Sequence, residues 1–148
     1  MLKWRPRGVH RKEYAVLEQD QAIDRDSEIR TDIPPVSVCL ITYNHASFIT
    51  ECLEGILRQR TDFPFEICIG EDESSDGTRE ICRTYAQKHS EKIRLILRSR
   101  QDPERSAYRS QGVYNFIETT KACRGKYVAH CDGDDVWLDP LKLQKQYD

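Results

Sequence analysis

Three aspartates fall within four positions of the stretch "YVAHCDGDDVW", residues 127–137: Asp132, Asp134 and Asp135. Like charges this close repel one another and raise one another's pKa values, and a bound cation reverses that tendency. One or two carboxylates, completed by phosphate oxygens and water, suit Mg²⁺ or Mn²⁺. The stretch therefore predicts a divalent-cation site that also holds a diphosphate, whose developing charge the ion would neutralise.

A second acidic stretch, "EDESSDGT" at residues 71–78, adds four carboxylates: Glu71, Asp72, Glu73 and Asp76. Neither G-x-G-x-x-G nor G-x-x-x-x-G-K-[ST], the glycine-rich patterns that cradle phosphates, is present. Simpler interpretations stay open, because an Asp-Gly pair is a common turn signal. Ser75 or Asp76 can also cap a following helix without any further function.

Buried-strand runs and helical periodicity alternate from residue 36 onward. Apolar runs predict strands at 36–41, 65–70, 92–98 and 126–131. Apolar positions at helical spacing predict helices at 47–59, 77–89 and 113–123 and a last helix from 139, with Ser47 and Asp139 as caps. The expected fold is α/β: a Rossmann-like, mainly parallel sheet with helices on both faces. Ligands bind beyond the carboxyl ends of such strands, where both acidic stretches stand.

The whole chain narrows the class of protein. Its 148 residues predict a polar N-terminal arm at 1–32 and one domain at 33–148. A formal net charge of -2 gives no pull toward nucleic acid. No apolar run is long enough for a membrane span, which predicts a cytoplasmic protein. A basic cluster around Trp4 allows a peripheral membrane contact, and a solvated tail is the simpler interpretation.

The remaining polar and aromatic candidates have simple structural interpretations. None of the six cysteines forms a C-x-x-C pair, so reduced core thiols are expected. His130 is interpreted as a structural histidine. His45 is either a ligand contact or a residue at the entry of a helix, and Trp137 either packs in the core or stacks on a ligand.

The chain from about Val36 to Tyr147 resembles the family-2 glycosyltransferases, the nucleotide-sugar transferases of the GT-A type. The resemblance rests on "VSVCLITYNH", "FEICIGEDESSDGT", "ACRGKYVAHCDGDDVW" and "DPLKLQKQ", in that order and spacing. It implies metal-dependent, inverting transfer of a hexosyl or N-acetylhexosaminyl group from a nucleoside-diphosphate sugar, with a UDP-sugar favoured. The acceptor would be the hydroxyl of a glycan or of a lipid-linked molecule in polysaccharide assembly.

The resemblance also assigns roles to residues. Thr42, Tyr43 and Asn44 would line the base, and Asp72 would hydrogen-bond the base or ribose. Asp132 would face the ribose and Asp134 would ligate Mn²⁺ or Mg²⁺ through the diphosphate, so these two form the predicted metal pair, with Asp135 as an auxiliary ligand. The family pattern A-R-N-x-G is replaced by "SAYRSQGVYNF", where Asn115 or Arg109 would substitute.

The resemblance places the general base beyond Asp148, so the catalytic residue is unknown and a fragment with little or no transfer activity is expected. Two alternatives stay open. One is a non-catalytic module that binds a nucleotide sugar. The other is a haloacid-dehalogenase-like phosphatase, in which Asp132 would be the nucleophile and Asp134 the acid/base. Its motif usually opens the domain, whereas here it stands near residue 148.

Overall fold

The computed structural model describes residues 2–3 and 33–148, and their backbone forms a five-stranded sheet in the order β1-β5-β2-β3-β4. Strands β2, β3, β4 and β5 run parallel, and β1 pairs antiparallel with β5. The expectation of a Rossmann-like, mainly parallel sheet is confirmed. The strands are β1 Leu2–Lys3, β2 Val36–Thr42, β3 Phe65–Glu71, β4 Ile93–Leu97 and β5 Tyr127–Asp132.

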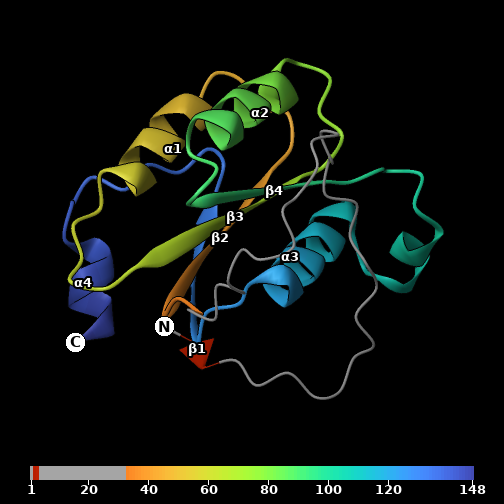
Figure 1. Ribbon diagram of the computed structural model, residues 1–148. Coiled ribbons are helices and arrows are strands. Elements are labelled where there is room, and N and C mark those ends of the chain that lie inside the picture. Colours follow the sequence, from red (N-terminus) through yellow and green to blue (C-terminus); the bar gives the residue numbers. More distant parts are fainter. Residues whose placement is uncertain (1, 4–32) are drawn as a thin grey trace, which may run out of the picture.

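Helices cover both faces of the sheet, as right-handed crossovers between parallel strands require. Figure 1 shows α1 and α2 on one face and α3 on the other. A short 3-10 helix, η1, lies between β4 and α3, and α4 follows β5. The helices are α1 Ile49–Leu57, α2 Thr78–Lys88, η1 Pro103–Ala107, α3 Gln111–Ala122 and α4 Lys142–Tyr147.

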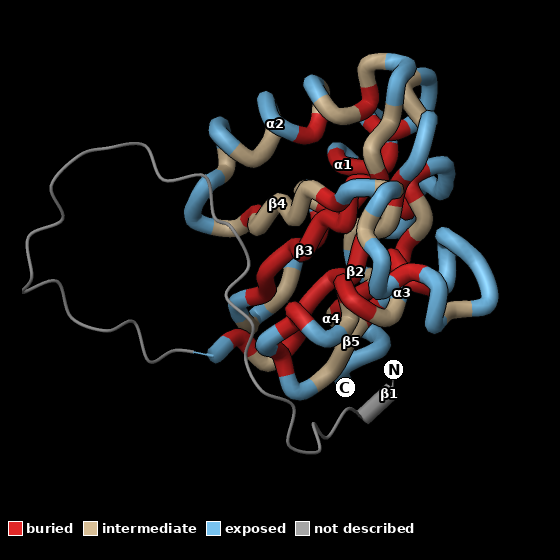
Figure 2. Tube along the Cα trace, turned by 90° about the vertical axis from the view of Figure 1, so that its right-hand side faces the viewer, coloured by how far each residue is buried: buried red, intermediate tan, exposed pale blue. Residues whose placement is uncertain are grey.

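The core lies around β2 and β3, the two central strands. Every residue of β3 is buried, and so is every residue of β2 except one, because helices pack on both of their faces (Figure 2). Helix α1 adds Ile49, Leu53 and Ile56, all with no exposed area. Burial of such a side chain stabilises a fold by about 1.5–3 kcal/mol. The sheet is therefore a firm support for the loops at its carboxyl edge.

All six cysteines are buried free thiols, which confirms that they are core residues. Two of them, Cys52 on α1 and Cys131 on β5, have their sulfur atoms 3.7 Å apart. Burial raises the pKa of the Cys82 thiol, on α2, to about 12. In the core these buried thiols act as small apolar side chains.

The structure corrects the predicted helix starts, by one residue for α2, which begins at Thr78, and by two for α3, which begins at Gln111. Helix α1 begins at Ile49 rather than 47, and Ser47 does not cap it. The carbonyl oxygen of His45 instead accepts hydrogen bonds from the backbone N–H groups of residues 48 and 49, which form a tight turn before the helix. Helix α4 begins at Lys142, and Asp139 accepts from the Leu141 N–H in the preceding turn.

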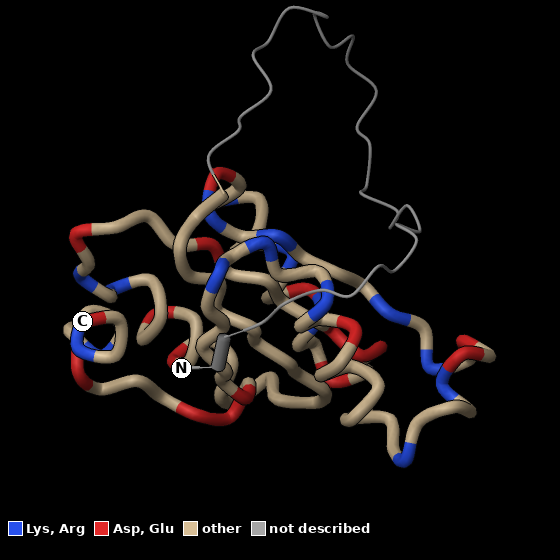
Figure 3. The backbone as a smooth tube through the Cα atoms, turned by 90° about the horizontal axis from the view of Figure 1, so that it is seen from below, with Lys and Arg blue, Asp and Glu red and all other residues tan. Residues whose placement is uncertain are grey.

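Most of the expected N-terminal arm lies outside the described residues. Within it, Leu2 and Lys3 form the edge strand β1, which the sequence did not predict, because two residues carry no periodicity. In the described part of the chain, no helix has the length and apolarity needed to cross a membrane. Basic and acidic residues are interspersed along the described backbone rather than gathered in one charged face (Figure 3).

Candidate functional site

A cleft of about 440 Å³ opens at the carboxyl edge of the sheet. Strand register places the ends of β2, β3 and β5 side by side, with Thr42 opposite Glu71 and Ile41 opposite Asp132. The first turn of α3 closes the cleft on another side. Its lining residues are Ile41, Thr42, Tyr43, His45, Asp72, Arg100, Gln111, Gly112, Asn115, Asp132 and Asp134.

The "DGDD" loop turns sharply at the end of β5. The Gly133 N–H donates to the carbonyl oxygen of Ile41 at 2.9 Å, and the Asp135 N–H donates to that of Asp132 at 3.0 Å. A Cβ at Gly133 would lie 2.5 Å from Oγ1 of Thr42, so only glycine allows this approach. The Asp-Gly turn is thus real, and it brings Asp132 to the cleft, where Asp134 also lies; Asp135 is not among the lining residues.

Asp132 and Asp134 fit a divalent cation whose other ligands are phosphate oxygens and water. Asp132 is about half exposed and Asp134 is exposed, so both carboxylates are open to solvent and to a ligand. Among the described residues, no group of three or more His, Cys, Asp or Glu side chains could hold a metal ion. Two carboxylates suit Mg²⁺ or Mn²⁺ when phosphate oxygens and water complete the coordination. The donor set therefore fits an ion bound together with a diphosphate.

Most of the acidic stretch after β3 is structural, which corrects the expectation of an acidic cleft edge. Glu71 is fully buried and pairs with Arg79. Glu73 accepts a hydrogen bond from the backbone N–H of Arg100. Asp76 accepts from the N–H of Thr78, the first residue of α2, at 3.0 Å, although the N-cap position itself is Gly77. Of the four carboxylates, Asp72 is the one that lines the cleft.

Two arginines neutralise Asp72, which is 2% exposed. Nη1 of Arg100 donates to its Oδ2 at 3.0 Å, and Nη2 of the buried Arg105 donates to Oδ1. The guanidinium of Arg100 also lies 4.0 Å from the centroid of the Tyr43 ring. Sequence reasoning missed both arginines. The available signal was the basic stretch "RSRQDPER" at residues 98–105, which also follows a strand end.

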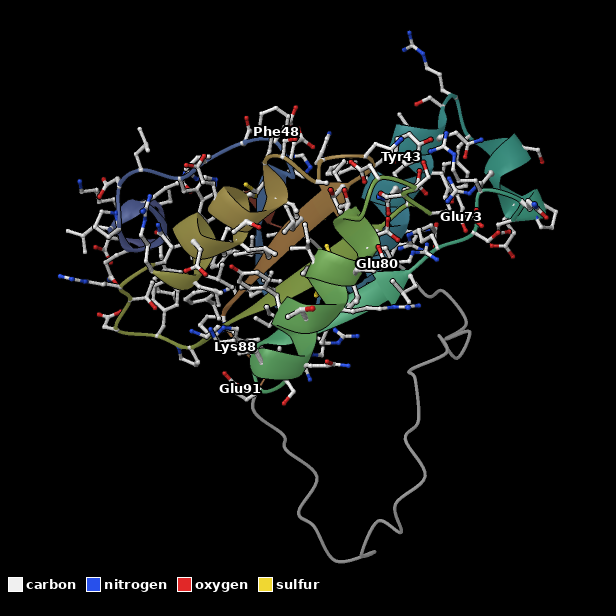
Figure 4. The ribbon with its side chains drawn as sticks, turned by 90° about the horizontal axis from the view of Figure 1, so that it is seen from above. Tyr43, Phe48, Glu73, Glu80, Lys88 and Glu91 are labelled. Carbon is white, nitrogen blue, oxygen red and sulfur yellow. The ribbon has the colours of Figure 1, made fainter. Side chains whose placement is uncertain are left out.

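The loops after β2 and β3 are joined by hydrogen bonds. Asn44, in a left-handed conformation (φ 54°), donates from its N–H to Oγ of Ser74 and accepts from the Ser75 N–H through Oδ1. The His45 N–H donates to Oγ1 of Thr78 at 2.8 Å. Asn44 therefore fixes the loops and is not among the cleft-lining residues, whereas Tyr43 lines the cleft. Figure 4 shows Tyr43 and Glu73 at the same end of the sheet, beside the segment after β4.

Asn115 supports the cleft from α3. Its side-chain amide donates to the carbonyl oxygen of Gly70 at 2.8 Å, and its Oδ1 accepts from Nε of Arg98 at 2.9 Å. Arg109, the other candidate for this role, is exposed and lines a second hollow of about 590 Å³ next to the cleft. Asn115 is thus the candidate that reaches the cleft.

The other three candidates lie in the cleft, on the surface and in the core. His45 lines the cleft, with Nδ1 3.3 Å from Oγ1 of Thr42. His130 is exposed, its ring meets Phe116 edge-on, and its Nε2 lies 3.6 Å from Oδ1 of Asp132. Trp137 is 6% exposed and belongs to the hydrophobic core, as the simpler interpretation held.

An α/β sheet with an open cleft at its carboxyl edge, lined by carboxylates and an aromatic ring, is the arrangement of nucleotide-binding α/β proteins. Sequence comparison defines the family within this class. The model of the family described as "Glycosyl transferase family 2" matches residues 37–148. The chain belongs to this family, so the resemblance found in the sequence is confirmed.

Known proteins similar to this chain are longer. The uncharacterized protein Rv1520 of Mycobacterium tuberculosis is 42% identical over 112 residues, which are 75% of this chain and 30% of that protein. S. aureus TarS in complex with UDP superposes with a TM-score of 0.57 at 27% identity, over 76% of this chain and 30% of that one. The mannosyltransferase PcManGT of Pyrobaculum calidifontis, in complex with GDP-Man and Mn²⁺, has the same TM-score and identity, over 74% and 30%.

Proposed function

We propose that the cleft binds a nucleoside-diphosphate sugar, and that the chain is the donor-binding part of a glycosyltransferase. One observation carries the proposal: an aromatic ring, a buried acceptor and two exposed carboxylates, Tyr43, Asp72, Asp132 and Asp134, line a single cleft. A ring offers a flat face for a nucleobase, and a buried carboxylate offers an acceptor for its N–H group. The solvent-open aspartates supply the place for the diphosphate.

Asp134 and Asp132 are the residues that would hold Mn²⁺ or Mg²⁺ with the diphosphate. The ion would supply charge neutralisation of the leaving nucleoside diphosphate. The similar mannosyltransferase, whose structure contains GDP-Man and Mn²⁺, supports this assignment. In our proposal Asp132 also faces the ribose, and Gly133 holds both aspartates in place through its close contact with Thr42.

UDP is the favoured nucleotide. Oδ1 of Asp72 is held by Arg105, which leaves Oδ2 as the carboxylate oxygen that a ligand can reach by replacing Arg100. One free acceptor suits a base with one ring N–H, such as uracil or thymine. The similar structure of TarS contains UDP. We further propose that the transferred group is a hexosyl or N-acetylhexosaminyl unit.

The acceptor side of the reaction remains a prediction from the family. We propose a hydroxyl acceptor on a glycan or lipid-linked molecule, inversion at the anomeric carbon and a role in polysaccharide assembly. None of the described residues is assigned as the general base, and the matched relatives are more than three times as long as their aligned parts. A cytoplasmic location and a peripheral membrane contact also remain predictions.

The test is a calorimetric titration of UDP into the purified chain with Mn²⁺, repeated in EDTA. Asp134→Asn and Asp135→Asn are a matched pair of variants, because they remove the same charge at adjacent positions and only Asp134 lines the cleft. We expect binding that needs Mn²⁺, falls about tenfold or more in Asp134→Asn and changes little in Asp135→Asn. Equal binding by all three proteins would contradict the metal assignment.

The non-catalytic binding module is the second candidate, and it shares the same cleft. Because no general base is assigned, donor binding and turnover are separate questions. Release of UDP from a UDP-sugar in the presence of candidate acceptors distinguishes the two. The phosphatase alternative gains no support, since its pattern calls for a lysine and further metal-binding carboxylates downstream of the motif, and no lysine of the described residues lines the cleft.

A further inference from the structure

Arg100 lies between the two groups that the proposed function assigns to the nucleobase. Its guanidinium is 4.0 Å from the centroid of the Tyr43 ring, and its Nη1 donates to Oδ2 of Asp72 at 3.0 Å. The backbone N–H of Arg100 also binds the Glu73 carboxylate, which fixes the start of the side chain. The side chain is 32% exposed and lies in the mouth of the cleft.

The contacts of Arg100 are those that a bound base would make. A guanidinium is a flat group with N–H donors in its plane, and it stacks on aromatic rings. A uracil base is also flat and carries one N–H donor on its edge. Both would place a face on Tyr43 and an N–H on Oδ2 of Asp72. Two groups cannot occupy the same volume, so the base and this position of Arg100 exclude each other.

Asp72 does not depend on Arg100 for its charge. Arg105, which is 5% exposed, pairs with the other carboxylate oxygen. Arg105 also donates from Nε to the carbonyl oxygen of Ser99 at 2.7 Å, which ties it to the backbone of the segment after β4. Asp72 would therefore remain paired and in place if Arg100 moved away.

A neighbouring space can receive the displaced side chain. Arg100 lines both the cleft and the second hollow of about 590 Å³. That hollow is open to solvent, so a guanidinium moved into it would remain hydrated. A rotation of the Arg100 side chain from one hollow to the other needs no movement of the sheet.

We propose that Arg100 occupies the nucleobase position in the free protein and leaves it when a nucleotide binds. The inference rests on the proposed function, because it takes the ligand to be a nucleotide whose base stacks on Tyr43. Arg100 is then a positioning residue that keeps Tyr43 and Asp72 arranged for a flat ligand. The contacts of Arg100 with Tyr43 and Asp72 must break before the base can bind. The affinity for the nucleotide is therefore lower than it would be without these contacts.

The experiment measures Mn²⁺-dependent affinity for two probes, UDP and inorganic pyrophosphate, by calorimetry. Pyrophosphate has no base, so it reports on the aspartate loop alone. Arg100→Lys keeps the positive charge but cannot stack as a plane, and Arg100→Ala removes both. Arg83→Ala is the matched control, because it removes an exposed arginine that lines neither the cleft nor the second hollow. Thermal unfolding shows whether each variant is folded.

We expect UDP to bind about three- to tenfold more tightly to Arg100→Lys than to the wild-type protein, with pyrophosphate affinity unchanged. Arg100→Ala should show the same gain after correction for any loss of UDP affinity measured in Arg83→Ala. The proposal would also be supported if both Arg100 variants bound UDP and the wild-type protein did not. Unchanged or weaker UDP binding by both variants would overturn it and leave the donor site intact. No UDP binding by any folded protein would overturn it together with the proposed function.

Discussion

Asn115 and Gly70 are in direct contact where α3 crosses β3. The side-chain amide of Asn115 donates to the carbonyl oxygen of Gly70, and a Cβ on Gly70 would lie 2.4 Å from Oδ1 of Asn115. The same Cβ would lie 2.0 Å from Oγ1 of Thr119. The helix can approach the strand this closely only because residue 70 has no side chain. This contact places the first turn of α3 beside the carboxyl edge of the sheet.

Gly70→Ala should destabilise the protein by about 1–3 kcal/mol, because the added methyl group overlaps Asn115 and Thr119 and must push α3 away from β3. Urea unfolding followed by circular dichroism measures the change. Gly112→Ala is the control, since a Cβ there would meet no atom within 4 Å and alanine favours a helix. A Gly70→Ala protein as stable as the control would show that the helix is not held at this distance.

Gly133→Ala should weaken Mn²⁺-dependent UDP binding by about tenfold. The new methyl group would lie 2.5 Å from Oγ1 of Thr42 and 2.7 Å from Nδ1 of His45, so the loop that carries Asp132 and Asp134 must shift. Calorimetry with UDP and Mn²⁺ measures the loss, and Asp135→Ala serves as the control, because it changes the same loop at a residue that does not line the cleft. Wild-type affinity in Gly133→Ala would mean that the aspartates need no fixed loop position.

The base preference should be UDP and dTDP over GDP and CDP, by about tenfold or more. Asp72 offers one carboxylate oxygen to a ligand, because Arg105 holds the other. Uracil and thymine each present one ring N–H to that oxygen. Guanine presents two adjacent donors that need two acceptors, and cytosine has an acceptor in place of the ring N–H. Competition of the four diphosphates against a fluorescent UDP analogue ranks them, and a preference for GDP would contradict this prediction.

Glu66→Gln should destabilise the protein at pH 7 and much less at low pH. Burial alone would raise the pKa of Glu66, but hydrogen bonds from Arg124 and Ser37 outweigh it and lower the pKa below the usual 4.5. A carboxyl whose pKa is lowered in the folded state stabilises the fold above the unfolded pKa, and the contribution disappears as pH falls through the folded pKa. The loss at pH 7 should be about 1–3 kcal/mol.

Urea unfolding of wild type and Glu66→Gln at pH 7 and at pH 3 tests this dependence. The two stabilities should converge at the lower pH, where the wild-type carboxyl approaches protonation. Glu66 lies at the opposite end of β3 from Asp72, so UDP binding provides an internal control and should not change. A constant difference at both pH values would show that charge on Glu66 does not contribute.

The order of strands and helices was predictable because each element has a strong local pattern. The runs "VSVCLI" and "FEICIG" are buried on both faces and are therefore almost entirely apolar. The strands predicted from them begin where β2 and β3 begin and end one residue earlier. Parallel strands put their carboxyl ends at one edge, which is enough to bring Asp72 and Asp132 to the same cleft. The loop that carries Asp132 was predictable for the same reason.

The partners of Asp72 were not predictable from the sequence. Arg100 and Arg105 lie 28 and 33 residues along the chain from it, in an irregular segment without periodicity. Sequence position therefore suggested an acidic edge, whereas the folded chain pairs that edge with cations. Asn44 shows the same limit, because the family resemblance implied that it lines the base, whereas its hydrogen bonds lead to Ser74 and Ser75.

The hydrogen bonds between the loops after β2 and β3 give the cleft one wall that is built as a unit with the core. Arg100, in the segment after β4, lines the mouth of the same cleft and is held there by side-chain contacts with Tyr43 and Asp72. A substitution of this partly exposed side chain can reshape the mouth of the cleft while the strands beneath it keep their positions. For a cleft that binds nucleotides as proposed, laboratory selection of a new nucleotide preference would therefore begin at Arg100, with Tyr43 and Asp132 as a constant frame.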